Sequence, residues 1–302
     1  NVVKNFGNDN LNGLYLVEFP ASESLAEAKA RLDADPAVEY TSLNYVRTIS
    51  AVPDDQDYSL LWGLNNTGQD GGTPGADINV SGAWDTTTGS SSFVVALLDT
   101  GVDYNHADLS GNIWTNTGEI PDNGIDDDSN GFIDDTRGWN FGTDNNDPMD
   151  TYGHGTHCAG TIGAVGNNGI GVTGVNWNVR IMPLRISRYG GAIYDSDAID
   201  AIHYAGSNGA DIVSCSWGGY GYDQAMKDAI DASPCLFVFA AGNDDMDNDI
   251  IPAYPASYTS KNIISVAASD NDDERAYFSN YGRTSVDIAA PGVNILSTYK
   301  GK

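Results

Sequence analysis

Cysteine, histidine and basic residues are scarce in this chain of 302 residues, and each shortage excludes something. The three cysteines, Cys158, Cys215 and Cys235, allow at most one disulfide and form no spaced framework. Only 14 Lys and Arg residues accompany 42 Asp and Glu residues, and the net charge of −28 makes nucleic acid and anionic membranes poor partners. No apolar run reaches the roughly 18 residues that a membrane span needs. No charged-then-apolar signal segment follows Asn1, so we expect the sequence to start at a cut edge of a longer precursor.

The N-terminal stretch differs in pattern from the rest and predicts a small α+β unit. Residues 14–19 and 38–49 have the apolar and β-branched character of strands. Between them, residues 24–36 predict a short helix that ends before its proline and is capped by Ser22 or Ser24.

Composition along the chain then suggests how the domains are arranged. Residues 1–49 form the small unit, and the polar residues 50–58 are typical of a linker with a processing site, between Thr48 and Pro53. The remaining residues, 59–302, are long enough for one large domain.

Strand and helix patterns alternate in this large domain. Helical patterns at 195–209 and 223–231 lie between apolar runs that are short and continuous, as in strands buried on both faces. The alternation predicts an α/β fold, a doubly wound and mostly parallel sheet with helices on both faces. Ligands of such sheets bind at the carboxyl ends of the strands. The predicted strands are 93–98, 179–184, 211–216, 235–240 and 262–267.

Polar residues stand at several of these carboxyl ends. Asp99 follows the first predicted strand, residues 216–218 follow the third, and Asn243 comes shortly after the fourth. A segment of small residues that is expected to be helical opens with His154. Each residue alone fits a structural role in a turn or cap, but together an acid, an imidazole and an amide could converge on one cleft.

Two of the four histidines, His154 and His157, lie three residues apart, and a metal pair is one interpretation. The helical zinc signature spaces its histidines four apart and places a glutamate between them. Here the spacing is three and no glutamate intervenes, which disfavours a metal pair. A core or supporting role suits His157 better.

The strings around these residues are more specific than any single residue. VVALLDTGVDYNHADL, GHGTHCAGTIGA and FAAGND resemble three signature blocks of the subtilisin-like serine proteases, in that family's order, and SWGG and AAPGVNILST fit as well. The resemblance covers residues 53–302 and points to the branch that includes thermitase. It implies that Asp99 is the triad acid, His154 the general base and Asn243 the side-chain donor to the oxyanion. Residues 1–49 resemble the latter part of the family's prodomain, which assists folding and then blocks the cleft.

The same resemblance implies how a substrate would bind. An extended peptide would pair with the backbone after the third predicted strand, like an added strand. Residues 189–194 are expected to be the opposing strand. Extended or unfolded polypeptides are therefore the expected substrates. The substrate-facing residues would be Ser216, Trp217, Gly218, Gly190 and Gly191.

The nucleophile block of the family, a GTSMA-like string, is absent from this sequence. By the family's spacing the chain stops before it, so we expect two of three triad members here and no turnover from this chain alone. The alternative is a non-catalytic relative, a pseudoprotease that binds extended peptides. A purely structural calcium module would leave Asp99, His154 and Asn243 without a purpose.

The loop AVGNNGIGVTGV, residues 164–175, suggests a first calcium site. The matching loop of the thermitase-like branch surrounds a calcium ion, which prefers an all-oxygen shell. A solvated Gly/Asn turn is the alternative. The ligands that the resemblance implies are the side chains of Asp55, Asp108 and Asn168 and the backbone carbonyls of Val165, Ile170 and Val172.

The segment NGIDDDSNGFIDD, residues 123–135, suggests a second calcium site. Alternate acidic and amide side chains followed by Gly131 match the opening of an EF-hand loop. The twelfth position holds Arg137 instead of a glutamate, so Asp134 or its neighbour would have to substitute. A hydrophilic insertion that its charge keeps soluble is the alternative. The expected ligands are Asp126, Asp128, Asn130, the Phe132 carbonyl and Asp135.

Together these patterns predict a calcium-stabilised serine endopeptidase precursor. Extracellular calcium is millimolar, which favours a secreted zymogen. The expected partners are its own prodomain and extended peptide substrates, and a monomer is expected.

Overall fold

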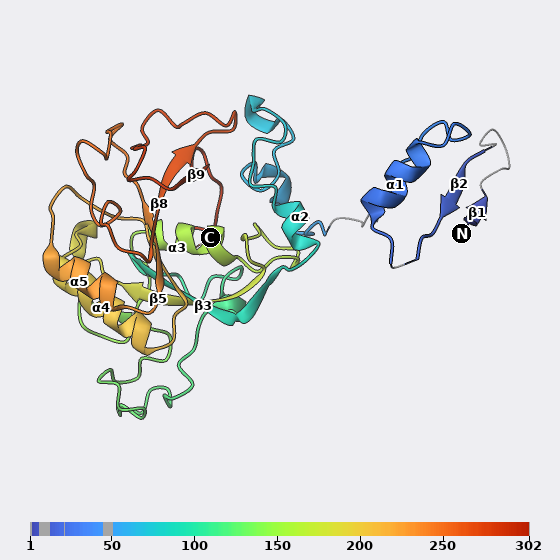
Figure 1. The fold of residues 1–302 in the computed structure, drawn as a ribbon. Coiled ribbons are helices and arrows are strands. Elements are labelled where there is room, and N and C mark those ends of the chain that lie inside the picture. The colour runs from blue at the N-terminus through green and yellow to red at the C-terminus, as the bar shows by residue number, and fades with distance from the viewer. Residues whose placement is uncertain (1, 6–12, 21, 45–50, 302) are drawn as a thin grey trace. The chain divides into compact units, whose positions relative to one another are not determined.

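Two compact units make up the chain, residues 1–49 and residues 50–302 (Figure 1). All candidate site residues belong to the second unit. In the described ranges, no helix is both long enough and apolar enough to cross a bilayer. The residues that the computed structural model describes are 2–5, 13–20, 22–44 and 51–301.

The described residues of the first unit form a two-stranded antiparallel sheet and one helix. Strand β1 (Val2–Asn5) pairs with β2 (Tyr15–Val17), which confirms the predicted strand at 14–19. Helix α1 (Leu25–Asp33) begins at a capping box: the Ser24 hydroxyl accepts from the Glu27 N–H at 3.3 Å, and the Glu27 carboxylate accepts from the Ser24 N–H at 3.0 Å.

The strand predicted over 38–49 does not appear in the described part of that range. Residues 38–44 pair with no neighbouring strand, and residues 45–49 lie outside the described residues. A strand forms only where a partner satisfies its backbone groups, and apolar character alone does not supply one. The prediction is therefore wrong for residues 38–44.

Residues 51–58, the predicted linker, pack against the second unit. Asp55 and Tyr58 are buried. The Asp57 N–H donates to the Gly171 carbonyl at 2.8 Å. The segment is therefore held in place by burial and hydrogen bonds and is no free linker.

A seven-stranded sheet forms the centre of the second unit, in the order β4-β5-β3-β6-β7-β8-β9. All neighbouring strands run parallel, which confirms the predicted sheet. The strands are β3 (Gly89–Asp99), β4 (Trp139–Asn140), β5 (Asn178–Arg185), β6 (Ile212–Cys215), β7 (Leu236–Ala240), β8 (Ile263–Ser269) and β9 (Ile288–Pro291).

Helices cover both faces of this sheet, as predicted. Successive side chains of β3 alternate, so that Ala96 and Leu98 enter one buried cluster and Val95 and Leu97 the other. The first cluster includes side chains of α4 and α5, and the second includes side chains of α2 and α3. The α-helices are α2 (Val80–Trp84), α3 (His154–Gly163), α4 (Asp195–Ser207) and α5 (Gln224–Ala232). Short 3-10 turns occur at Tyr58–Leu60, Gln69–Gly71, Ser110–Asn112 and Tyr189–Gly191.

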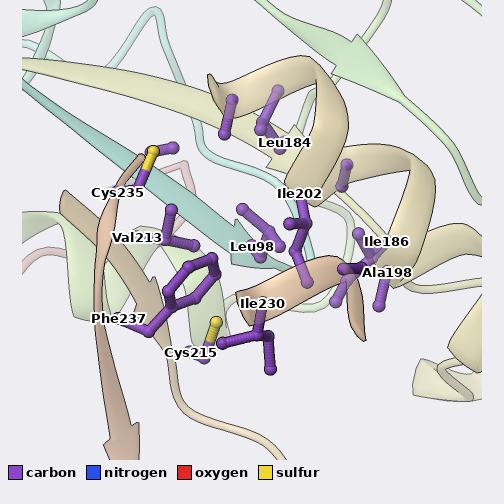
Figure 2. Packing of buried hydrophobic residues seen from close by; sticks show 14 of the residues in the cluster. Leu98, Leu184, Ile186, Ala198, Ile202, Val213, Cys215, Ile230, Cys235 and Phe237 are labelled. Atoms are coloured by element: carbon purple, nitrogen blue, oxygen red, sulfur yellow. The ribbon is translucent and has the colours of Figure 1, made fainter. Parts of the chain in front are cut away.

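The first cluster fills the space between the sheet and the α4–α5 pair. Figure 2 shows Ile202 of α4 and Ile230 of α5 beside the sheet side chains, among them Phe237. Fully burying one such side chain contributes roughly 1.5–3 kcal/mol. Cys215 and Cys235 lie in this cluster as free thiols, so the core depends on packing and not on a disulfide. This packing fixes where the strands end.

Candidate active site

The carboxyl ends of three neighbouring strands bring the predicted residues to one edge of the sheet. Asp99 is the last residue of β3, and β6 ends at Cys215, next to Ser216. β7 ends at Ala240, three residues before Asn243. Because β3, β6 and β7 are neighbours and parallel, their ends lie side by side.

Asp99 and His154 form a direct hydrogen bond, with 2.7 Å between Asp99 Oδ1 and His154 Nδ1. Asp99 is 2% exposed, whereas the His154 side chain is 46% exposed. Asp99 Oδ1 also accepts from the Thr100 N–H at 2.7 Å, and within the part of the chain that the structure describes its buried Oδ2 has no hydrogen-bond partner. A buried carboxylate thus holds one nitrogen of a ring whose other side faces solvent.

The electrostatics of this pair favour the imidazolium. The hydrogen bond to Asp99 raises the pKa of His154 above its usual 6.5, the Cys158 thiol adds to the increase, and burial opposes it. A raised folded-state pKa means that protonated His154 contributes stability below about pH 6.5, which is lost as the pH rises through the raised value. The pair can therefore stabilise a positive ring that forms during proton transfer.

Helix α3 approaches β3 closely because glycines line the contact. Gly153, the N-cap residue of α3, has φ 114°, a backbone conformation that residues other than glycine rarely adopt. A Cβ on Gly155 would lie 2.1 Å from the Gly101 carbonyl oxygen and 3.1 Å from the Asp99 Cβ. Only glycine at 155 therefore lets His154 come within hydrogen-bonding distance of Asp99.

We expect Gly155→Ala to lower the free energy of unfolding by about 1–3 kcal/mol, because overpacking must move α3 away from β3. Urea unfolding of the two proteins measures the difference. The control is Gly82→Ala in α2, where the added Cβ meets nothing closer than 4.0 Å; there we expect no loss, or a gain of up to about 1 kcal/mol. Equal stability of Gly155→Ala and the wild type would contradict the close-contact argument.

The second histidine of the segment has a different role from the first. His157 Nε2 lies 3.0 Å from the Ile295 carbonyl oxygen, which ties α3 to the segment after β9. Cys158 is half-buried, with its Sγ 3.9 Å from His154 Nδ1 and 3.7 Å from the Ser216 hydroxyl. The thiol therefore lies beside the His154 ring.

Residues 216–218 form an unpaired backbone edge next to this pair. Among the described residues they make no backbone–backbone hydrogen bond, whereas Gly219 pairs with Tyr254 through bonds of 2.8 and 2.7 Å. A Cβ on Gly218 would lie 2.8 Å from the Tyr254 carbonyl oxygen. Glycine at 218 therefore makes room for Tyr254, and its predicted contact with a substrate stays a prediction.

The strand predicted over 189–194 is wrong. The segment instead contains a 3-10 turn, Tyr189–Gly191, and one antiparallel bridge between Ser187 and Ile193. Gly190 and Gly191 have φ of 77° and 84°, which an extended strand cannot accommodate. The two glycines bend the chain back on itself.

Two cavities lie along the unpaired edge. One of about 340 Å³ is lined by Gly191, Trp217 and Gly218 and by the first residue of α4, Asp195. The other, of about 200 Å³, is lined by Ser216, Trp217, Gly218 and Asn243. Asn243 is exposed, and in the described chain no hydrogen bond joins it to Asp99 or His154.

Loop 164–175 meets the predicted first calcium ligands Asp55 and Asp108. Asp55 Oδ2 accepts from the Asn167 N–H at 2.6 Å, while its buried Oδ1 has no hydrogen-bond partner among the described residues. Asp108 accepts from the Asn168 side chain at 2.8 Å and from the Val172 N–H at 2.9 Å. Burial raises the pKa of both carboxyls. In the described chain the carbonyls of Val165, Ile170 and Val172 accept no hydrogen bond.

The Asn168 side chain lies beside Asp108, another predicted ligand, and its role as a ligand stays a prediction. Its Nδ2 donates to Asp108, and its Oδ1 accepts from the Ile170 N–H at 2.8 Å. The amide oxygen is thus engaged within the loop. The unpartnered Asp55 oxygen and the free carbonyls nevertheless fit a hard cation that takes oxygen ligands.

In the second predicted calcium segment, Asp128 and Asp135 lie close to Glu119, an acidic residue that the sequence analysis did not predict as a ligand. Carboxylate oxygens of Glu119, Asp128 and Asp135 lie within 4.8 Å of one another. The Asn130 side chain donates to Asp128 at 3.2 Å and to Asp135 at 3.0 Å. Glu119 lies outside the EF-hand pattern, so no spacing rule pointed to it.

Two other predicted ligands, Asp126 and the Phe132 carbonyl, are not part of the three-carboxylate group, and their roles as ligands stay predictions. Asp126 accepts from the N–H groups of Asn130 and Gly131 at 3.1 and 2.9 Å, which closes the turn at Gly131, φ 97°. Phe132 packs edge-on against Trp139 and other rings. Buried Asp135 also accepts from the Tyr204 hydroxyl, and that bond and burial raise the pKa of Tyr204.

Comparisons with known proteins identify the family of this chain. The chain matches the profile of the Subtilase family over residues 90–302, well over half of its length. It is 36% identical over 274 residues to a thermophilic serine proteinase of Bacillus sp. (strain AK1), covering 89% of this chain and 59% of that protein. It is 33% identical over 310 residues to an extracellular protease of Xanthomonas campestris pv. campestris, covering 95% of this chain and 51% of that protein.

A solved structure has the same architecture. A protease of Pseudoalteromonas arctica superposes with a TM-score of 0.62 at 30% identity, covering 80% of this chain and 73% of that one. The chain spans 51–59% of the length of the two relatives above. With the family profile, the sheet topology and the strand-end residues in agreement, the chain belongs to the subtilase family of serine proteases.

Proposed function

We propose that this chain supplies the acid and the base of a serine endopeptidase. The observation that carries the proposal is the 2.7 Å hydrogen bond between buried Asp99 and the solvent-facing ring of His154. In the described residues, no serine hydroxyl hydrogen-bonds to that ring, and its Nε2 is available to a nucleophile.

The chemistry follows from the protonation states of the pair. A serine hydroxyl is a weak nucleophile and attacks a peptide carbonyl only when a base removes its proton. His154 Nε2 takes that proton and later gives it to the leaving amine, while Asp99 holds the Nδ1–H tautomer and stabilises the imidazolium without being protonated. The Asn243 amide, on the same edge, is the proposed donor to the oxyanion of the tetrahedral intermediate.

Extended polypeptides are the proposed substrates. The free backbone groups of residues 216–218 can pair with a peptide as an added strand. The cavities on either side, lined by Trp217 and Gly218 with Gly191 or Asn243, would accept its side chains. Pairing through backbone groups carries little side-chain selectivity, so we expect broad specificity.

Calcium is the proposed stabilising ion. Asp55, Asp108 and the carbonyls of Val165, Ile170 and Val172 would hold one ion, which when bound supplies positive charge to two buried carboxylates. The support is the partnerless buried oxygen of Asp55. A second ion would bind at Glu119, Asp128 and Asp135, with Asp126 closing the turn beside it.

Removing calcium is expected to lower the midpoint of thermal unfolding. At free calcium 100 times above the Kd, a bound ion stabilises the fold by about 2.7 kcal/mol. In Asp55→Ala, the part of the EDTA-induced fall in the unfolding midpoint that comes from the first site should mostly disappear. Scanning calorimetry with calcium and with EDTA measures it.

The control is Asp200→Ala, which removes an exposed carboxylate of α4. It should respond to EDTA as the wild type does. A chelator response of the same size in Asp55→Ala and the wild type would contradict the first site, and Asp128→Ala tests the second in the same way.

We also propose that residues 1–49 act as an inhibitory prodomain and that the mature protein is a secreted monomer. The support is the pair of proposed calcium sites, which millimolar extracellular calcium would fill, and the separate compact unit formed by residues 1–49.

A hydrolysis assay tests the proposed function. The protein, expressed from its full reading frame and supplied with calcium, should cleave a denatured protein substrate, and a serine-directed fluorophosphonate should abolish the cleavage. Peptide binding without any cleavage would indicate the non-catalytic relative and overturn the proposal.

A further inference from the structure

One buried carboxylate next to the pair takes no part in the chemistry described so far. Asp150 is 4% exposed and lies four residues before His154. In the described part of the chain, Asp150 forms no ion pair. Burying a carboxylate without a counter-charge is costly unless hydrogen bonds compensate. The bonds that hold Asp150 therefore indicate what it does.

Five donors converge on the Asp150 side chain. Its Oδ1 accepts from the N–H groups of Tyr152 and Gly153, both at 2.8 Å, and from the Thr100 hydroxyl at 3.0 Å. Its Oδ2 accepts from the N–H and the hydroxyl of Thr156, at 2.9 and 2.7 Å. Bonds to an ionised acceptor are stronger than neutral ones, so this group is rigid.

The donors come from both sides of the acid–base pair. Thr100 directly follows Asp99, and its N–H donates to Asp99 Oδ1 at 2.7 Å. The Thr100 hydroxyl in turn accepts from the Gly155 N–H at 2.9 Å, next to His154. The end of β3 and the start of α3 are thus joined through Asp150 and Thr100.

Helix α3 also lacks a cap of its own. Its N-cap residue, Gly153, has no side chain to accept from the first free N–H groups. Asp150 accepts from Thr156, the third residue of the helix, and Thr100 accepts from the second. The cap comes from outside the helix, and it is the one that fixes where α3 begins.

We propose that Asp150 is a positioning residue that sets the Asp99–His154 hydrogen bond. The expected effect on kcat rests on the proposed function, whereas the expected effect on the Asp99–His154 hydrogen bond does not. Among the described residues, Asp150 forms no hydrogen bond with the His154 ring. It acts by holding the carboxyl end of β3, at Asp99, at a fixed distance from the first turn of α3.

Asp150→Asn tests the proposal because it keeps the shape and replaces one acceptor oxygen with an NH₂ group. The NH₂ group cannot accept hydrogen bonds, so the donors that contact either Oδ1 or Oδ2 of Asp150 lose their acceptor. The direct readout is the downfield NMR signal of the His154 Nδ1–H, assigned by its absence in His154→Ala. We expect this signal to move upfield or broaden. We also expect kcat to fall about 10- to 100-fold with KM within about twofold, since a small misplacement of catalytic groups has effects of this size.

Asp77→Asn is the matched control. Asp77 is a carboxylate that also accepts backbone N–H groups, from Asn66 and Asn79 at 2.7 and 2.6 Å. The loop that contains Asp77 contributes no residue to the Asp99–His154 pair. Even if Asp77→Asn lowers stability, we expect its His154 Nδ1–H signal and its kcat to stay at wild-type values. This comparison separates an effect on positioning from general destabilisation.

Thr100 provides a second route if Asp150→Asn does not fold. Thr100→Val removes the hydroxyl and should shift the Nδ1–H signal in the same direction, whereas Thr100→Ser should restore it. Wild-type Nδ1–H signals in both Asp150→Asn and Thr100→Val would overturn the proposal. If the wild type cleaves no peptide, the proposed function fails, and the NMR signal still decides the role of Asp150.

Discussion

Replacing His154 with alanine is expected to lower kcat for peptide hydrolysis by about 10⁶-fold, a loss of the size known for the catalytic histidine of subtilisin, a member of this family. The reason is the loss of the base that takes the nucleophile's proton and returns it to the leaving amine. The fold should persist, because 46% of the His154 side chain is already exposed to solvent. Steady-state kinetics on a peptide amide, with circular dichroism as a check of folding, measures the effect.

Two other histidines provide controls for this experiment. His203→Ala changes an exposed side chain of α4 and should leave kcat unchanged. His157→Ala removes the contact with the Ile295 carbonyl and should affect stability more than chemistry. A larger loss of kcat in His157→Ala than in His154→Ala would show that the wrong histidine has been assigned as the base.

Asp99→Asn is expected to lower kcat by about 10⁴-fold with little change in structure. An asparagine that donates to His154 Nδ1 would fix the wrong tautomer, with the proton on Nε2, where the nucleophile needs an acceptor. The same substitution removes the main cause of the raised His154 pKa, so His154 should titrate closer to 6.5. NMR titration of the ring and the pH dependence of kcat/KM measure the two effects.

Asp211→Asn is the matched control, because its side chain bonds to the same strand. The Asp211 carboxylate accepts from the Val94 N–H of β3 at 2.8 Å, far from the carboxyl end of that strand. We expect wild-type activity and an unchanged His154 titration. If Asp99→Asn kept both at wild-type values, the acid–base assignment would have to be abandoned.

The strand ends could be predicted because their cause is local. A continuous apolar run such as residues 93–98 forms a strand buried on both faces, and the first polar residue after it must sit at the sheet edge. Asp99 and the start of α3 at His154 follow from this logic and from the family resemblance. Strands β4 and β9 were missed because they are short and carry no long apolar run.

Other features depend on contacts that no local pattern encodes. The bend at Gly190 and Gly191 comes from positive φ angles, which the sequence permits but does not require. Glu119 joins Asp128 and Asp135 only through the path of the loop. No sequence pattern separates Asp150 from the neighbouring acids, whereas its five hydrogen bonds in the structure do.

The separation of partners along the chain has a consequence for folding. Asp99 and His154 are 55 residues apart, and Asp55 and Asn167 are 112 apart. Closing such long loops costs entropy before any contact repays it, and all-parallel sheets therefore form slowly. The acid–base pair of the proposed protease should accordingly form late in folding, so that a half-formed chain would not digest its neighbours.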